Sequence, residues 1–246
     1  MRIGVFDSGV GGLTVTKSLL DSKYFSEIIY FGDTARVPYG SKDKNIIIRY
    51  ALEAVEFFKN FDIKLLVVAC NTVSAFALQQ MRDEADFEII GVIDSGVEAL
   101  LKRNFHKDHQ VLVIGTEATI GSDSYQQLLK NNGYQSIEAI PTPLLVPIVE
   151  EGVRGAVLRE TLNLYFGELK NLPDSIILGC THFPLISNEI RDYFKDSPEL
   201  IHSGDAIIEH LKKVYTFKRK FDTDIKIFAS ENPKSLRAFA KKWLYN

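Results

Sequence analysis

The stretch VVACNTVSA, residues 67–75, passes from a continuous apolar run through a cysteine into polar residues that can open a helix. The stretch LGCTHFPL, residues 178–185, repeats this order around the only other cysteine of the chain. Continuous apolar runs of this length are typical of parallel strands that are buried on both faces. We therefore predict that each cysteine lies at the carboxyl end of a buried parallel strand.

Similar runs rich in Val and Ile alternate with longer amphipathic stretches along the 246 residues, which predicts an α/β fold. Helices are expected at 43–59 with Ser41 as the cap, at 122–131, and at the C-terminus from Pro233. The expected strands are 3–6, 28–31, 65–69, 89–93, 111–114, 137–140 and 176–178.

Short motifs that follow apolar runs occur in pairs, in the same order in both halves of the chain. The pairs are DSGV at 7–10 and 94–97, FGDT at 31–34 with IGTE at 114–117, and ACNT at 69–72 with GCTH at 179–182. This repetition predicts two similar parallel-sheet α/β domains that face each other across a central cleft. Because ligands bind beyond the carboxyl ends of parallel strands, the cleft would receive one thiol from each domain.

The composition is that of an ordinary globular protein, with 46% hydrophobic and 25% charged residues. A net charge of −3 and a pI near 6.0 argue against a nucleic-acid partner and favour small-molecule chemistry. Two cysteines without a C-x-x-C pair indicate free thiols rather than a disulfide framework or a zinc site. The amino-terminal residues lack signal-peptide features and no apolar run is long enough to span a membrane, so we expect a cytoplasmic protein without a membrane partner.

Two opposed thiols suit the inversion of a carbon stereocentre. A single cysteine after a strand is more often a buried small hydrophobe, but a matched pair favours chemistry. The start of a helix lowers a thiol pKa from its ordinary value of about 8.5, so we expect a thiolate near neutral pH. One thiolate would remove a proton from one face of the carbon, and the other thiol would deliver a proton to the opposite face.

Such a reaction builds negative charge beside a carboxylate and needs hydrogen-bond donors there. Ser8 and the backbone of 9–12 form a glycine-rich turn suited to an anion. The turn is not a dinucleotide fingerprint, because Thr14 stands where the third glycine would be, and it lacks the lysine of a P-loop. Asp7 and His182 flank the expected cleft, either as helpers in proton transfer or as ordinary caps and hydrogen-bond partners.

Segments spread over nearly the whole chain carry a family resemblance. They are GVFDSGVGGLTV (4–15), IYFGDTARVPYG (29–40), VVACNTVSA (67–75), IGTEATIGSDSY (114–125), LLVPIVEEG (144–152) and LGCTHFPL (178–185). Together they resemble the glutamate racemase family of the cofactor-independent aspartate/glutamate racemase superfamily, and the ordered set is far more specific than any one segment.

The resemblance implies that Cys70 and Cys180 are the two catalytic acid/bases and that Asp7 and His182 assist them. Asp33 and Glu150 would be further polar groups near the cleft. No cofactor, neither a metal nor pyridoxal phosphate, is implied. The implied substrate contacts are Asp7, Ser8, Pro38, Tyr39, Gly40, Asn71, Thr72, Thr116, Thr119, Thr181 and His182.

The same resemblance implies a cytoplasmic homodimer that interconverts L- and D-glutamate and supplies D-glutamate for peptidoglycan synthesis. It also implies a first domain of residues 1–92 plus 206–246 and a second domain of residues 93–205. The family more often has proline in the segment where this chain has GVIDSGVEA, residues 91–99, so Asp94 and Ser95 are assigned no catalytic role.

Other functions remain open at this point. A racemase of the same superfamily that acts on aspartate or another small acid would differ mainly in pocket volume. A redox dithiol protein is disfavoured by the missing C-x-x-C pair. A module that merely binds an acidic amino acid would leave both thiols dispensable.

Overall fold

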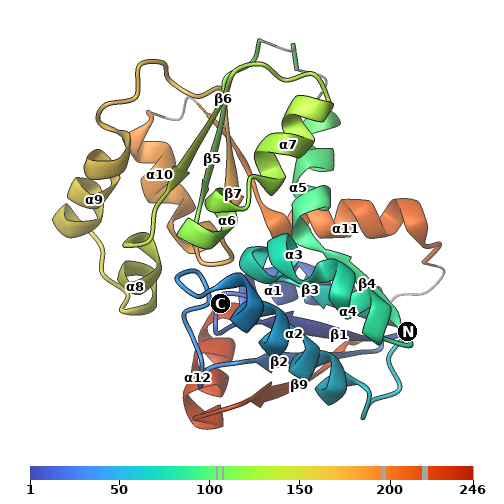
Figure 1. Cartoon of the computed structure of the whole chain (residues 1–246). Helices are drawn as coiled ribbons and strands as arrows, with labels where there is room; N and C mark the ends of the chain where they lie inside the picture. The colour runs from blue at the N-terminus through green and yellow to red at the C-terminus, as the bar shows by residue number, and fades with distance from the viewer. Residues whose placement is uncertain (104, 107, 196–197, 218–220, 246) are drawn as a thin grey trace.

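The strands of the chain form two separate parallel sheets, each covered by helices on both faces (Figure 1). This computed structural model describes residues 1–103, 105–106, 108–195, 198–217 and 221–245. The two sheets confirm the predicted class of two parallel-sheet α/β units.

The first sheet has its apolar residues packed on both faces, as the continuous apolar runs predicted. Its strands, in spatial order, are β4 (Glu88–Gly91), β3 (Leu65–Val68), β1 (Arg2–Asp7), β2 (Glu27–Gly32) and β9 (Asp224–Ala229). One face packs against α1 (Leu13–Ser22), α11 (Ser203–Val214) and α12 (Pro233–Leu244). The other packs against α2 (Lys44–Phe58), α3 (Asn71–Phe76) and α4 (Leu78–Glu84).

The second sheet is built in the same way. Its strands, in spatial order, are β6 (Ile137–Pro141), β5 (Val111–Gly115), β7 (Ser175–Gly179) and β8 (Glu199–Ile201). One face packs against α8 (Leu145–Glu150), α9 (Ala156–Phe166), η1 (Phe183–Ile186) and α10 (Ser187–Tyr193). The other packs against α5 (Val92–Leu101), α6 (Glu117–Gly121) and α7 (Ser124–Asn131).

The two sheets share one strand order. The order β4, β3, β1, β2 of the first sheet corresponds to the order β8, β7, β5, β6 of the second. Strand β7 is thus the counterpart of β3, so Cys180 after β7 and Cys70 after β3 occupy equivalent places. Two of the three predicted motif pairs are wrong. DSGV at 94–97 lies inside α5, and IGTE at 114–117 follows β5, which is the counterpart of β1 and not of β2.

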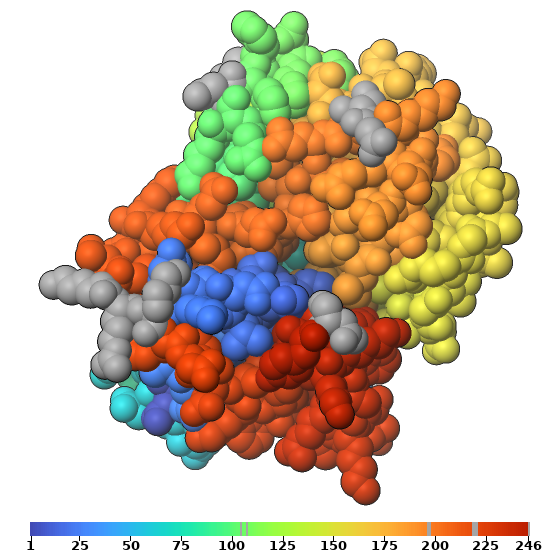
Figure 2. All heavy atoms as spheres, turned by 180° about the vertical axis from the view of Figure 1, so that it is seen from behind, coloured from blue at the N-terminus to red at the C-terminus, as the bar shows by residue number. Residues whose placement is uncertain are grey.

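The chain crosses between the units twice. It leaves the first sheet after β4 and enters α5, and it returns from β8 through α11, which packs against both α5 and α1. Figure 2 shows orange atoms of this part of the chain between the green second unit and the blue first unit. The two crossings lie together, so the carboxyl ends of the two sheets meet on the far side of this connection (Figure 1).

The observed bounds correct several local predictions. Helix α2 is capped by Asp43, whose carboxylate accepts from the Asn45 amide at 2.8 Å, and not by Ser41. Helix α7 begins at Ser124 rather than at Ser122. Residues 92 and 93, predicted to end a strand, open α5. Strands β8 and β9 were not predicted, whereas the C-terminal helix from Pro233 is confirmed.

Among the described residues, no helix has both the length and the apolarity that crossing a membrane requires.

Candidate active site

A small, partly open cavity lies where the carboxyl ends of the two sheets meet. Its volume is about 30 Å³, which is room for one or two water molecules. Both cysteines line it, one from each unit. The lining residues are Ser8, Val37, Pro38, Tyr39, Gly40, Cys70, Asn71, Thr72, Thr116, Val146, Gly179, Cys180, Thr181 and His182.

Most of the predicted substrate contacts are therefore gathered around one cavity. Asp7 and Thr119 lie directly behind lining residues and touch them through hydrogen bonds. The lining residues that sequence reasoning missed are Val37, Val146 and Gly179, which are apolar or lack a side chain and so carried no chemical signal.

The Cys70 thiol lies in the first unit, between β3 and α3. It donates to the Ser8 hydroxyl at 3.7 Å. Burial and the nearby Asp7 carboxylate raise the pKa of Cys70 to about 12, although the Val73 amide and Ser8 oppose this shift. The prediction of a lowered thiol pKa is thus wrong for Cys70, because loss of solvation outweighs the few donors at the start of α3. Cys70 is a protonated acid in this state.

Cys180 has a different partner. The His182 Nδ1 atom lies 3.6 Å from its sulfur, and the His182 Nε2 atom lies 2.9 Å from a Glu150 carboxylate oxygen. Burial lowers the pKa of His182, but the contacts with Cys180 and Glu150 outweigh burial and raise it to about 10. A cationic imidazole at neutral pH stabilises negative charge on the Cys180 sulfur. The two thiols therefore have different neighbours, a hydroxyl and a carboxylate at Cys70 and an imidazole at Cys180.

Asp7 joins the two units at the end of β1. One carboxylate oxygen accepts from the Gly9 amide at 2.9 Å, and the other accepts from the Thr181 hydroxyl at 3.3 Å. Burial raises the pKa of Asp7, while the nearby His182 and these donors oppose that rise. A buried carboxyl group with a raised pKa beside Cys70 is a suitable proton relay.

Hydroxyl groups from both units meet on another wall of the cavity. The Thr72 hydroxyl lies 3.0 Å from that of Thr116 and 3.2 Å from that of Thr119. Thr116 is held in place because its hydroxyl caps α6 and accepts from the Thr119 amide at 3.1 Å. These groups can donate to or accept from a polar ligand that replaces their mutual contacts.

The loop of residues 37–40 closes the site above the hydroxyl groups. The Gly40 carbonyl accepts from the Ala118 amide of the second unit at 3.0 Å. A Cβ atom at Gly40 would lie 2.5 Å from the Thr116 Cβ, so only glycine permits this approach.

Asp33 does not line the cavity. It is fully buried behind the loop, where one carboxylate oxygen accepts from the Tyr39 hydroxyl and from Arg36 Nε. Its predicted place near the cleft is correct only in this indirect sense, and the arrangement indicates a support for the loop.

Comparison with known proteins bears on this arrangement. The profile of the Asp/Glu/Hydantoin racemase family matches residues 14–211. The chain belongs to this racemase family. The glutamate racemase of Nitratiruptor sp. is 61% identical over 99% of this chain and 96% of that protein.

Solved structures of the racemase family have the same fold. The crystal structure of glutamate racemase from Campylobacter jejuni is 50% identical, covers 99% of this chain and 98% of its own, and has a TM-score of 0.96. The Francisella tularensis glutamate racemase, solved in complex with D-glutamate, is 32% identical, covers 100% of this chain and 94% of its own, and has a TM-score of 0.85.

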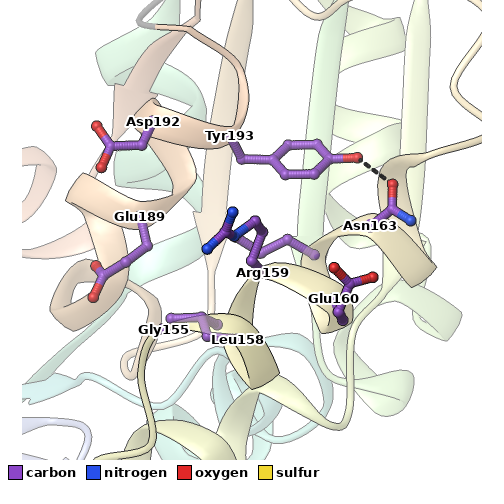
Figure 3. Close-up of a pocket in the computed structure, with 9 residues that line it drawn as sticks. Gly155, Leu158, Arg159, Glu160, Asn163, Glu189, Asp192 and Tyr193 are labelled. Carbon is purple, nitrogen blue, oxygen red and sulfur yellow. Dashed lines mark hydrogen bonds between the residues drawn. The ribbon is translucent and has the colours of Figure 1, made fainter.

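A larger hollow lies away from the thiols of this family member. It measures about 640 Å³ and lies between α9 and α10 (Figure 3). Charged side chains of Arg159, Glu160, Glu189 and Asp192 line it. Neither cysteine does, so the small cavity and not the large hollow is the candidate active site.

Within the described ranges, no three His, Cys, Asp or Glu side chains are grouped so that they could hold a metal ion.

Proposed function

We propose that this chain interconverts L- and D-glutamate by proton transfer at the α carbon, with one thiol on each side of the substrate. The observation that carries the proposal is that two buried cysteines from equivalent places in two similar units line one cavity. Glutamate as the substrate is supported by the names of the relatives and by the D-glutamate complex of the Francisella tularensis enzyme.

The different settings of the thiols assign their roles. Starting from L-glutamate, a Cys180 thiolate beside the His182 cation removes the α proton. The protonated Cys70 then delivers its proton to the opposite face of the carbanion, which gives D-glutamate. Starting from D-glutamate, Cys70 is the base and Cys180 is the acid. Each turnover leaves the two thiols with exchanged protonation states.

Asp7 and His182 assist these transfers. The Asp7 carboxyl group faces Cys70 and can take up or return the proton that the thiol must lose before it acts as a base. His182 keeps the charge of the Cys180 thiolate balanced, and Glu150 keeps His182 protonated. The negative charge that grows beside the α-carboxylate is stabilised by donors held in place around the cavity.

Substrate binding falls to the remaining polar lining. Ser8, Asn71, Thr72 and Thr181 offer side-chain donors to the two carboxylates, and Thr116 and Thr119 support Thr72. The backbone of 38–40 forms the opposing wall. Because the cavity holds only one or two waters when closed, the two units must separate to admit an amino acid.

Circular dichroism of L-glutamate incubated with the purified chain tests the proposal. The signal should decay to zero without any added cofactor, and D-glutamate should decay to the same end point. Both enantiomers of aspartate serve as the comparison for selectivity. A stable glutamate signal, or faster loss of the aspartate signal, would overturn the proposed substrate.

The resemblance supports further proposals on organisation and role. The enzyme acts as a cytoplasmic homodimer, without a nucleic-acid or membrane partner, and its D-glutamate enters peptidoglycan synthesis. Its first domain is residues 1–92 plus 206–246, and its second domain is residues 93–205. Sedimentation measures the oligomeric state, and limited proteolysis maps the domain boundaries.

A further inference from the structure

Asn71, the residue after Cys70, has an unusual hydrogen-bond balance. Its side chain is buried and lines the cavity. The carbonyl oxygen of its amide accepts a hydrogen bond, whereas the amide nitrogen has no partner among the described residues. A buried donor without a partner is costly, so such a group is best explained when a ligand completes it.

The donor to Asn71 comes from the other unit. The Tyr125 hydroxyl of α7 lies 2.7 Å from Asn71 Oδ1. Burial raises the pKa of Tyr125, so the hydroxyl keeps its proton and remains a donor. The nearby Ser203 hydroxyl opposes that rise, while its own proton is donated to the Leu178 carbonyl at 3.5 Å. The Tyr125 hydroxyl donates its proton to Asn71 Oδ1 at 2.7 Å.

The ring of Tyr125 is held as firmly as its hydroxyl. It is fully buried and lies between α5 and the end of β7. A Cβ atom at Gly96 would lie 3.4 Å from the ring, and one at Gly179 would lie 3.3 Å from it. Gly96 belongs to the DSGV segment, to which no catalytic role is assigned, and it places the backbone of α5 beside this ring.

We propose that Tyr125 is a positioning residue that fixes the orientation of the Asn71 amide, so that its NH₂ group and not its oxygen faces the substrate. This inference rests on the proposed function, since it needs a carboxylate in the cavity to receive the NH₂ group. The amide of an asparagine is nearly symmetric in shape, so packing alone does not choose between its two orientations. In this structure the Tyr125 hydroxyl donates to Asn71 Oδ1, which leaves the NH₂ group for the cavity.

The contact also links substrate binding to closure of the two units. Tyr125 belongs to the second unit and Asn71 to the first, so the amide is oriented only when the units meet. In the open state the amide is free to turn, and closure prepares the donor at the moment when the substrate is enclosed.

The test is a double-mutant cycle on Tyr125→Phe and Asn71→Ala, with kcat and KM measured for glutamate. Tyr125→Phe keeps the ring and removes only the hydroxyl. We expect kcat/KM to fall about threefold to tenfold, mainly through KM, which is the factor carried by one hydrogen bond of ordinary net strength. In the Asn71→Ala background, Tyr125→Phe should have no further effect, because the group that it orients is gone.

Tyr193→Phe is the matched control. It also removes a tyrosine hydroxyl that contacts an asparagine, here Asn163 at 3.4 Å, but it lies in the α9–α10 hollow away from the thiols (Figure 3). We expect its kinetic constants to match those of the wild type. Asn71→Ser replaces Asn71→Ala if the alanine variant does not fold.

Several outcomes overturn the inference. If Tyr125→Phe lowers kcat/KM by the same factor in both backgrounds, the tyrosine acts through general packing. If it changes nothing in the wild-type background, the hydroxyl does not orient the amide. If either result is found and the wild-type enzyme racemises glutamate, the inference on Tyr125 fails but the proposed function stands. If the wild-type enzyme does not racemise glutamate, both the inference and the proposed function fail.

Discussion

Gly11→Ala should disturb closure of the two units more than folding, because the closest contacts of the added methyl group lie in the other unit. A Cβ atom at Gly11 would lie 2.6 Å from His182 Nδ1 and 2.7 Å from His182 Cε1, and would also meet the Thr181 hydroxyl. Ordinary contact begins near 3.4 Å, so the His182 ring must retreat by about 0.8 Å. The hydrogen bond from the Thr14 hydroxyl to the Thr181 carbonyl, 2.8 Å long, would stretch with it.

A displacement of this size at the reacting groups costs on the order of 100-fold in rate, so kcat/KM should fall by about that factor. The three nearest contacts of the added methyl group all lie in the other unit, so the secondary structure should be unchanged and the melting temperature should fall by no more than about 5 °C. Circular dichroism measures all three quantities. Gly121→Ala is the control, since a Cβ atom at Gly121 meets nothing within 4 Å. Retention of more than a third of wild-type kcat/KM in Gly11→Ala would refute the reasoning.

Three further predictions concern the thiols. Cys70→Ala and Cys180→Ala should each lower racemisation by about 10²-fold to 10⁴-fold with the fold intact, and near-normal turnover in either variant would sink the two-thiol mechanism. The pH profile of kcat/KM should be bell-shaped. In Glu150→Gln the alkaline limb of this profile should move to lower pH, because loss of the carboxylate lowers the pKa of His182 from about 10. An alkaline limb at the wild-type pH would count against the ion pair of Glu150 and His182. In heavy water, NMR should find deuterium at Cα in early D-glutamate product while the remaining L-glutamate stays protonated, and product that keeps its original hydrogen would point to a single base.

Much of the fold is readable from the sequence because strands buried on both faces leave continuous apolar runs. The two strands that were missed break this rule. Strand β8 has only three residues, and β9 lies at the edge of its sheet, where Asp224 and Lys226 interrupt the apolar pattern. The false DSGV pair shows a different limit, since four identical letters do not distinguish a strand end from the interior of a helix.

The candidate site was predictable in its members but not in its electrostatics. Segment matching identified the cysteines and most of the lining, because their polar neighbours are part of the motifs. It gave Cys70 the wrong thiol pKa, because burial depends on how two distant units meet. Tyr125 was overlooked for the same reason: a tyrosine on an amphipathic helix resembles a core residue, and only the tertiary structure brings its hydroxyl to Asn71.

The small volume of the cavity requires a movement of the two units in every catalytic cycle. With room for a water or two, it can neither admit nor release an amino acid until the units part, so each turnover contains at least one opening. Such motions take microseconds to milliseconds and proceed against the friction of the surrounding liquid. Raising the viscosity of the buffer should therefore lower kcat, and the effect should be larger when the chemical steps are faster. The movement of whole domains then limits the rate of a reaction that transfers a single proton.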